Sequence, residues 1–141
     1  MGAPEREVVA VIGDGGYQMT IQELGTIFQT QTAVKIVVLN NDFLGMVRQW
    51  QQLFFEKRYA STEMVNPNFV AIAKGYHLEA KKVDKREHLD AAVAEMIASE
   101  KPYFLEICVE KEANVFPMIP TGASVSELSL IHISEPTRRR G

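Results

Sequence analysis

The sequence has few of the features that mark secreted, membrane or nucleic-acid-binding proteins. Cys108 is its one cysteine in 141 residues, which excludes an internal disulfide. No apolar run approaches the roughly 18 residues of a membrane helix, and the acidic start at 4–7 is unlike a signal peptide. With a formal net charge of −3, the chain has no basic excess to attract nucleic acid. We therefore expect a protein of a reducing, cytoplasmic compartment whose partners are neither membranes nor nucleic acids.

What is present is the composition of an ordinary globular domain, with 46% apolar and 23% charged residues. Apolar runs predict four strands, at 8–12, 35–39, 78–83 and 104–109. Apolar residues at helical spacing predict four helices, at 20–28, 43–59, 69–74 and 89–97. Strands that alternate with helices in this way predict an α/β fold, in which a parallel sheet is flanked by helices.

Local signals add detail to these elements. The β-branched run at 8–12 is typical of a strand that is buried on both faces. Thr20 and Glu23 have the spacing of a capping box, so we expect a helix to begin there. Its sheet-facing residues would be Ile21, Leu24 and Phe28. Similar start signals precede the last two helices, at 66–68 and 84–87.

Both ends of the sequence differ from the middle. A buried parallel strand that starts at residue 8 implies neighbouring elements before it, so we expect a domain that is incomplete at its N-terminus. Residues 128–138 resemble the translation of a sequencing-library adapter, which predicts a non-native tail at 128–141. We therefore expect one partial domain, in 1–127.

Polar residues follow the first two predicted strands. Asp14 comes directly after the first strand, and Asn41 follows the second. The carboxyl ends of parallel strands meet at one edge of a sheet, where α/β proteins bind their ligands. A carboxylate with an amide oxygen suits Mg²⁺ rather than zinc. Gly13, Gly15 and Gly16 would bring backbone amides to the same place, near a helix start that favours a diphosphate. These residues predict a Mg²⁺–diphosphate site.

The two motifs are specific only in combination. A lone Gly-Asp-Gly is also a common tight turn, and Asn-Asn is weaker still. Here the 24 residues from 16 to 39 separate the two motifs, and one crossover helix joins them. This arrangement resembles the signature of thiamine-diphosphate enzymes. Residues 45–51 and 116–123 are moreover similar to segments of the acetolactate synthase family, so that the resemblance covers nearly all of 7–127.

The resemblance assigns roles to individual residues. Mg²⁺ would be held by the side chains of Asp14 and Asn41 and by the backbone carbonyl of Phe43. The cofactor-binding residues would be Gly13, Asp14, Gly15, Gly16, Asn41, Gly45 and Met46. The substrate and inhibitor channel would be lined by Met46, Val47 and Trp50. The family's catalytic glutamate belongs to an N-terminal pyrimidine-binding domain, so no catalytic residue is expected in this chain.

The resemblance also implies an activity. The enzyme would be a transferase that decarboxylates pyruvate on thiamine diphosphate and condenses the two-carbon unit with pyruvate or 2-oxobutyrate. This reaction belongs to the synthesis of the branched-chain amino acids isoleucine and valine. The whole enzyme would also bind FAD and would form a homodimer or tetramer, with or without a regulatory small subunit. We expect the isolated chain to have no synthase activity.

Simpler interpretations of individual residues stay open. Trp50 and Met46, at helical spacing, are also typical of a core or a subunit interface. Arg48 would ordinarily be a solvated charge, and the alternative is a role facing the substrate. Asp42 would face solvent or cap the next helix. Two histidines are expected at the surface, His77 and His88.

Two alternatives to acetolactate synthase also stay open. Other thiamine-diphosphate enzymes, such as glyoxylate carboligase, pyruvate oxidase or a 2-oxo-acid decarboxylase, share the metal signature. A non-catalytic α/β module could instead bind Mg²⁺ through Asp14, without any dependence on thiamine diphosphate.

Overall fold

The computed structural model of the protein describes residues 6–119 and 124. The chain divides into two compact units. The first, here named the sheet unit, comprises the described residues up to Phe43 and Met64–Lys111. The second, here named the helix unit, comprises Leu44–Glu63 and the described residues from Glu112 onward. The predicted tail at 128–141 and the predicted domain end at 127 lie outside the described residues.

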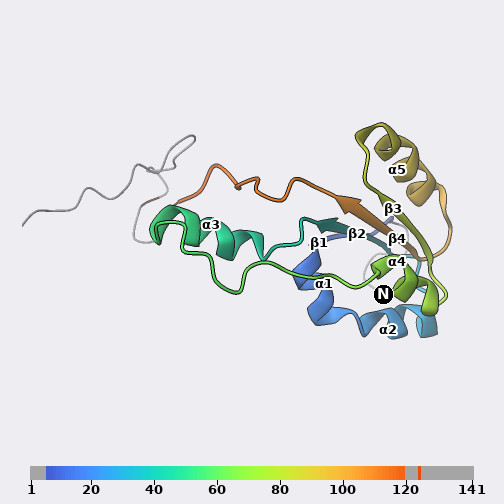
Figure 1. Cartoon of the computed structure of the whole chain (residues 1–141). Coiled ribbons are helices and arrows are strands. Elements are labelled where there is room, and N and C mark those ends of the chain that lie inside the picture. Colours follow the sequence, from blue (N-terminus) through green and yellow to red (C-terminus); the bar gives the residue numbers. More distant parts are fainter. Residues whose placement is uncertain (1–5, 120–123, 125–141) are drawn as a thin grey trace, which may run out of the picture. The chain divides into compact units, whose positions relative to one another are not determined.

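The sheet unit contains four parallel strands (Figure 1). They are β1 (Val9–Gly13), β2 (Lys35–Asn40), β3 (Glu79–Val83) and β4 (Tyr103–Cys108). Their order in the sheet is β1-β2-β4-β3, and every pairing is parallel. Each strand begins and ends within about one residue of the predicted run, well inside the usual uncertainty of such boundaries. The predicted α/β fold with a parallel sheet is confirmed.

Helices cover both faces of the sheet, and each face has its own core. On one side lie α1 (Asp14–Thr20), α2 (Glu23–Thr30) and α4 (Phe69–Gly75), and on the other lies α5 (Leu89–Ala98) (Figure 1). The first core contains Phe69 and Phe104, both fully buried, whose rings contact that of Tyr17. The second core packs Leu105 against Met96. Phe104 and Leu105 face opposite cores because successive side chains of a strand alternate.

β1 is less buried than predicted. Val9 and Val11 are 41% and 63% exposed. Val11 pairs in register with Val37, which belongs to the core beneath α5. α5 packs on β3 and β4, at the opposite edge of the sheet, so among the described residues it leaves this face of β1 uncovered. For these residues the prediction of a strand buried on both faces is wrong.

The first helix begins earlier than predicted. α1 starts at Asp14, directly at the end of β1, with Gly13 as its N-cap residue and no side-chain cap. Thr20 is its last residue, and the Thr20 hydroxyl donates to the carbonyl of Gly16 at 3.2 Å. α2 then starts at Glu23, also without a side-chain cap. The predicted capping box is wrong, because a threonine hydroxyl inside an existing helix bonds the carbonyl one turn back.

The residues predicted to face the sheet from the second helix are correct in part. Leu24 is buried, and Ile21 packs beside the same core. Phe28 is 42% exposed, and its ring lies 4.8 Å from that of His77. The prediction for Phe28 is wrong, because its ring lies beside that of the exposed His77 and not in the core. His77 and His88 are exposed, as predicted.

The predicted starts of the later helices differ in outcome. Asn68 caps α4, since its side chain accepts a hydrogen bond from the Ala71 N–H at 2.9 Å, which confirms that start. α5 begins at Leu89 after a short 3₁₀ turn, and its N-cap residue His88 makes no side-chain cap. The start signal at 84–87 therefore predicted the wrong cap. In the described part of the chain, no helix is long and apolar enough to cross a membrane.

The helix unit contains α3 (Gly45–Phe54), which confirms the helix predicted in 43–59. Its buried side is polar: Arg48 and Gln49 are 3% and 1% exposed. Gln49 holds the backbone of Val115 at both groups, accepting from its N–H at 2.8 Å and donating to its carbonyl at 2.9 Å. The side chain of Gln49 thus replaces the backbone partner that a neighbouring strand would provide.

The burial of Arg48 also corrects a prediction, namely that this residue is a solvated charge. Its guanidinium lies 3.2 Å from the carboxylate of Glu112 and 5.5 Å from the ring centre of Tyr59. It also donates to the backbone carbonyl of Glu112 at 3.3 Å. A planar guanidinium can pair with a carboxylate and stack on an aromatic ring at the same time. Arg48 therefore holds segments of the helix unit together.

Candidate functional site

Asp14 lies where β1 ends, next to the end of β2. Gly13 pairs in register with Leu39, so Asp14 and Asn40 follow side by side at the carboxyl edge of the sheet. The carboxylate of Asp14 is buried, at 1% exposure. A buried carboxylate is stable only when hydrogen bonds or a cation offset its lost hydration. The partners of Asp14 therefore determine what this site can do.

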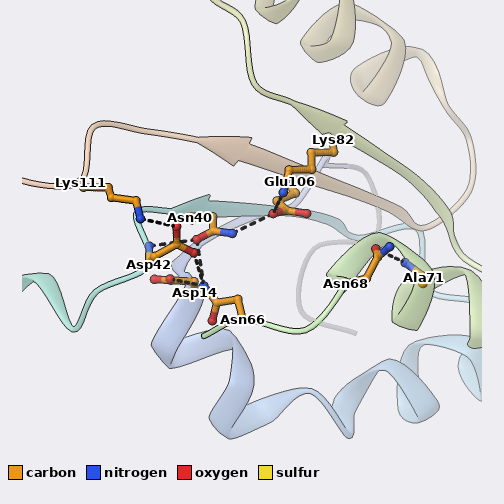
Figure 2. Close-up of polar contacts among 9 residues, drawn as sticks. All are labelled: Asp14, Asn40, Asp42, Asn66, Asn68, Ala71, Lys82, Glu106 and Lys111. Carbon is orange, nitrogen blue, oxygen red and sulfur yellow. Dashed lines mark hydrogen bonds and ion pairs between the residues drawn. The ribbon is translucent and has the colours of Figure 1, made fainter. Parts of the chain in front are cut away.

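One of those partners is Asn66, from the loop before α4 (Figure 2). Its amide nitrogen lies 2.7 Å from Oδ2 of Asp14, 2.9 Å from Oδ1 of Asn40 and 3.1 Å from Oδ1 of Asp42. An amide NH₂ group has two protons, so these three oxygens share two donors. The cluster of converging oxygens keeps acceptor capacity that a cation could use. We call these four residues the Asn66 cluster.

The prediction for Asp42 is correct in part, since its side chain is 37% exposed but does not cap α3. Asp42 adopts a left-handed backbone conformation, with φ 55°, and one of its carboxylate oxygens lies beside Asn66. The other oxygen pairs with Nζ of Lys111 at 3.1 Å. Both partners of this pair are partly exposed, so it adds at most about 1 kcal/mol of stability. Its main effect is to orient the carboxylate toward the cluster.

Asn41 and Phe43, the other two predicted metal ligands, share a turn. Oδ1 of Asn41 accepts a hydrogen bond from the Phe43 N–H at 3.2 Å, which is an Asx-turn. A carbonyl oxygen has two lone pairs, so Oδ1 of Asn41 can take a second partner such as a metal ion. The structure brings Asp14 together with Asn40 and Asp42, while the assignment of Asn41 and Phe43 as ligands stays a prediction.

The glycines around Asp14 differ in their surroundings. A Cβ on Gly16 would lie 3.1 Å from Cγ1 of Ile12, so a glycine here lets α1 start close against β1. A Cβ on Gly13 would meet no atom within 4 Å. Gly15 is buried. Gly15 and Gly16 lie in the first turn of α1, where the N–H groups have no acceptor within the helix. Their predicted contact with a diphosphate stays a prediction.

The chemistry of this donor set fits a hard cation. Mg²⁺ is usually bound through one or two carboxylates, with further oxygens from phosphates or water. The Asn66 cluster offers carboxylate and amide oxygens and no sulfur or imidazole nitrogen. Across residues 6–119 and 124, no three His, Cys, Asp or Glu side chains gather into a metal-binding group. The amide oxygens are thus as important to the cluster as its carboxylates.

A second buried charge, which the sequence did not reveal, lies behind the cluster (Figure 2). Glu106 is 2% exposed and accepts hydrogen bonds from Nδ2 of Asn40 and Nζ of Lys82, both at 2.8 Å. The hydrogen bond to Glu106 raises the pKa of Lys82. A chain of hydrogen bonds therefore runs from Lys82 through Glu106 to Asn40, which belongs to the Asn66 cluster. The one sequence signal was a glutamate within the apolar run at 104–109.

The remaining predicted residues belong to α3 of the helix unit. They are Gly45, Met46, Val47 and Trp50. Met46 and Val47 are 52% and 47% exposed, whereas Trp50 is partly buried with its ring 5.1 Å from that of Phe54. The exposed side chains leave one side of α3 available for a ligand or for another surface. Their assignment to the cofactor and the substrate channel stays a prediction.

Comparison with known proteins identifies the family. Residues 1–107 match the family described as thiamine pyrophosphate enzyme, C-terminal TPP binding domain. The chain belongs to this family. The resemblance predicted from Gly-Asp-Gly and Asn-Asn is confirmed, and the Asn66 cluster lies within the matched part of this TPP-binding domain.

Relatives of the TPP-binding domain include acetolactate synthases. The chain is 42% identical over 126 residues to the acetolactate synthase isozyme 2 large subunit of Escherichia coli K12, covering 89% of the chain and 23% of that protein. It is 41% identical over 124 residues to the mitochondrial acetolactate synthase catalytic subunit of Saccharomyces cerevisiae, covering 88% of the chain and 18% of that protein. The chain thus spans about a fifth of the length of these relatives.

A solved structure supports the fold. The thiamine diphosphate-dependent 4-hydroxybenzoylformate decarboxylase of Rhodococcus jostii RHA1 superimposes with a TM-score of 0.71 at 26% sequence identity. The match covers 79% of this chain and 21% of that one. The parallel sheet flanked by helices therefore also occurs in a thiamine diphosphate-dependent enzyme.

Proposed function

We propose that the chain is the diphosphate- and metal-binding part of an acetolactate synthase. Such an enzyme decarboxylates pyruvate and transfers the two-carbon unit to a second 2-oxo acid. The observation that carries the proposal is the buried carboxylate of Asp14, held among amide oxygens where β1 and β2 end. Identities of 36–42% with acetolactate synthases support this choice among the reactions of the family.

In this proposal the sheet unit binds the charged end of the cofactor. The side chains of Asp14 and Asn41 and the carbonyl of Phe43 would hold Mg²⁺. The first-turn N–H groups at Gly15 and Gly16 would donate to the diphosphate, whose negative charge the Mg²⁺ ion would offset. The site would then bind Mg²⁺ and the diphosphate together, because the positive charge of the metal ion offsets the negative charge of the diphosphate.

The helix unit would supply apolar surfaces. Gly45 and Met46 would lie against the rings of the cofactor, and Val47 and Trp50 would border the substrate channel. Thiamine diphosphate, when bound, supplies the carbon nucleophile and the electron sink for decarboxylation. The apolar side chains of α3 would limit the access of water to the reacting carbon. We assign no acid or base to this chain.

The proposal extends to the complete enzyme. Its substrates would be pyruvate and 2-oxobutyrate, and its products would lead to isoleucine and valine. FAD, a homodimer or tetramer, a regulatory small subunit and a cytoplasmic location are further parts of this proposal.

A chimera tests the reaction. Residues 7–127 would replace the matching segment of the E. coli acetolactate synthase isozyme 2 large subunit, to which the chain is 42% identical over 126 residues. We expect the chimera to form acetolactate from pyruvate, and acetohydroxybutyrate when 2-oxobutyrate is added. The matched control is the same chimera with Asp14→Ala, which should be inactive. A chimera that binds thiamine diphosphate and Mg²⁺ but forms neither product would refute the proposed reaction.

The isolated chain tests whether this part of the enzyme has synthase activity by itself. Incubated with pyruvate, thiamine diphosphate, Mg²⁺ and FAD, the 141-residue chain should form no acetolactate. Steady acetolactate formation would show that the chain contains a complete active site and would contradict the proposal.

A second candidate is a thiamine-diphosphate-dependent 2-oxo-acid decarboxylase. The specific observation in its favour is the structural match to the decarboxylase of Rhodococcus jostii. The chimera discriminates the two, since a decarboxylase would release acetaldehyde from pyruvate where a synthase forms acetolactate.

A further inference from the structure

Asn66 uses both ends of its amide to connect separate elements. Its Oδ1 accepts a hydrogen bond from Nε2 of Gln18 at 2.6 Å, on α1. Its Nδ2 reaches the carboxylate of Asp14, at the start of the same helix, Asn40 at the end of β2, and Asp42 in the turn that follows. One partly buried side chain thus joins the helix that carries Asp14 to the turn that carries the other predicted ligands.

Asn68, two residues further along the same loop, provides a contrast (Figure 2). Its side chain is exposed and caps α4 through the N–H of Ala71. Asn68 therefore makes a local contact, whereas Asn66 contacts residues 24 to 52 positions away in the sequence. Helix capping requires a hydrogen-bond acceptor at 68, but it does not require an amide at 66.

The amide of Asn66 separates two carboxylates. Asp14 and Asp42 both accept from the same nitrogen, and two negative groups held this close repel each other unless donors or a cation lie between them. Lys111 pairs with Asp42. Glu106 pairs with Lys82 and accepts a hydrogen bond from Asn40. The neutral amide lies between the two carboxylates, and a carboxylate oxygen that accepts one hydrogen bond can still take a second partner such as a metal ion.

We propose that Asn66 is a positioning residue for the metal site, which fixes the carboxylate of Asp14 relative to the turn after β2. This inference rests on the proposed function, because the metal ion concerned is the one that carries the diphosphate. Asn66 itself is not assigned as a ligand. Partners of this kind behind a metal ligand typically change metal affinity about 10- to 100-fold when removed.

The first test measures binding. Calorimetric titration of the 141-residue chain with thiamine diphosphate in the presence of Mg²⁺ gives the affinity of wild type, Asn66→Ala and Asn68→Ala. We expect Asn66→Ala to bind at least about tenfold more weakly than wild type. Asn68→Ala, which loses a helix cap in the same loop, should stay within about twofold of wild type, because its contact does not reach the Asn66 cluster.

The second test needs no cofactor. Asn66→Asp keeps the size of the side chain but places a third carboxylate beside Asp14 and Asp42, and like charges held this close repel one another. The melting temperature of the variant at pH 7 should therefore be lower than that of wild type, and Mg²⁺ alone should restore it. Asn68→Asp adds the same charge and still caps α4, so its melting temperature should match that of wild type with and without Mg²⁺.

The outcomes separate this inference from the proposed function. If wild type binds the cofactor and Asn66→Ala binds it equally well, Asn66 has no positioning role and the proposed function stands. If wild type binds no cofactor, the proposed function fails for this chain, and melting temperatures of Asn66→Asp with and without Mg²⁺ decide the role of Asn66. Identical melting temperatures of Asn66→Asp and Asn68→Asp, with and without Mg²⁺, would overturn it.

Discussion

The sheet unit and the helix unit are stabilised in opposite ways. In the sheet unit, Phe69, Phe104 and Leu105 are fully buried, and the polar side chains gather where the strands end. In the helix unit, Arg48 and Gln49 are buried and hydrogen-bonded, while apolar residues of the same helix are about half exposed. The core of one unit is mainly apolar, and the interior of the other depends on hydrogen bonds.

This difference explains where binding chemistry can arise. Apolar burial carries most of the free energy of folding, so the sheet unit can accommodate buried polar groups such as Asp14 and Glu106 at one edge. The helix unit uses its polar groups to hold its own segments, and it leaves Met46 and Val47 exposed. We therefore expect charged ligands to depend on the sheet unit and apolar contacts on α3.

The largest effect should follow from a cavity in the sheet unit. Phe104→Ala removes a fully buried ring that contacts Tyr17, so the free energy of unfolding should fall by about 3–5 kcal/mol. Urea denaturation followed by circular dichroism measures this. Val11→Ala, on the exposed side of β1 at 63% exposure, should change it by less than about 0.5 kcal/mol. Equal losses for the two variants would contradict an apolar core centred on β4.

Loss of the buried carboxylate should come next. Asp14→Ala should weaken the binding of thiamine diphosphate with Mg²⁺ by about two orders of magnitude or more, because Asp14 is the proposed ligand and a ligand matters more than its supporting partners. Isothermal titration calorimetry measures the affinity, and Asp84→Ala, at an exposed position after β3, is the control. Mg²⁺ binding to wild type that is equally strong without thiamine diphosphate would instead favour a non-catalytic metal-binding module.

The sheet could be predicted from the sequence because its signals are local. Residues 36–39 are apolar and mostly β-branched, a pattern typical of a buried strand. Asp14 could be located for the same reason, since it directly follows such a run. By contrast, Thr20 has the pattern of a helix start but lies at a helix end, because Gly13 and Asp14 had already started the helix.

The Asn66 cluster could not be predicted, because its contacts are not local. Asn66 lies 52 residues from Asp14, and next to Pro67 and Asn68 it has the pattern of an ordinary helix start. Which face of α3 is buried could not be predicted either. Its helical spacing indicates two faces, but the segment around Val115 determines which of them is covered, and nothing in 45–54 reveals that partner.

A smaller effect should be confined to the helix unit. Gln49→Ala leaves the N–H and the carbonyl of Val115 without their side-chain partner, which should cost about 1–2 kcal/mol. Hydrogen exchange should show a faster Val115 amide and an unchanged Leu105 amide in β4. Gln29→Ala, at an exposed position of α2, should alter neither amide. Faster exchange at Leu105 would mean that the two units do not open independently.

The smallest effect concerns Tyr17, whose polar hydroxyl is buried in the apolar core of the sheet unit. Tyr17 is 3% exposed, and within the described residues its hydroxyl has no hydrogen-bond partner. Burial raises the pKa of Tyr17 well above its ordinary value. Above about pH 10, the unfolded chain releases this proton while the folded chain retains it, so stability falls as the pH rises.

Tyr17→Phe removes both the unpaired hydroxyl and this ionisation. It should raise the free energy of unfolding by about 1 kcal/mol at pH 7 and reduce its decline above pH 10. Tyr103→Phe, which loses a hydrogen bond to Glu95, should give no such gain at pH 7. Denaturant titrations at pH 7 and pH 10.5 compare the variants, and a loss of stability in Tyr17→Phe at pH 7 would show that the hydroxyl is paired in solution.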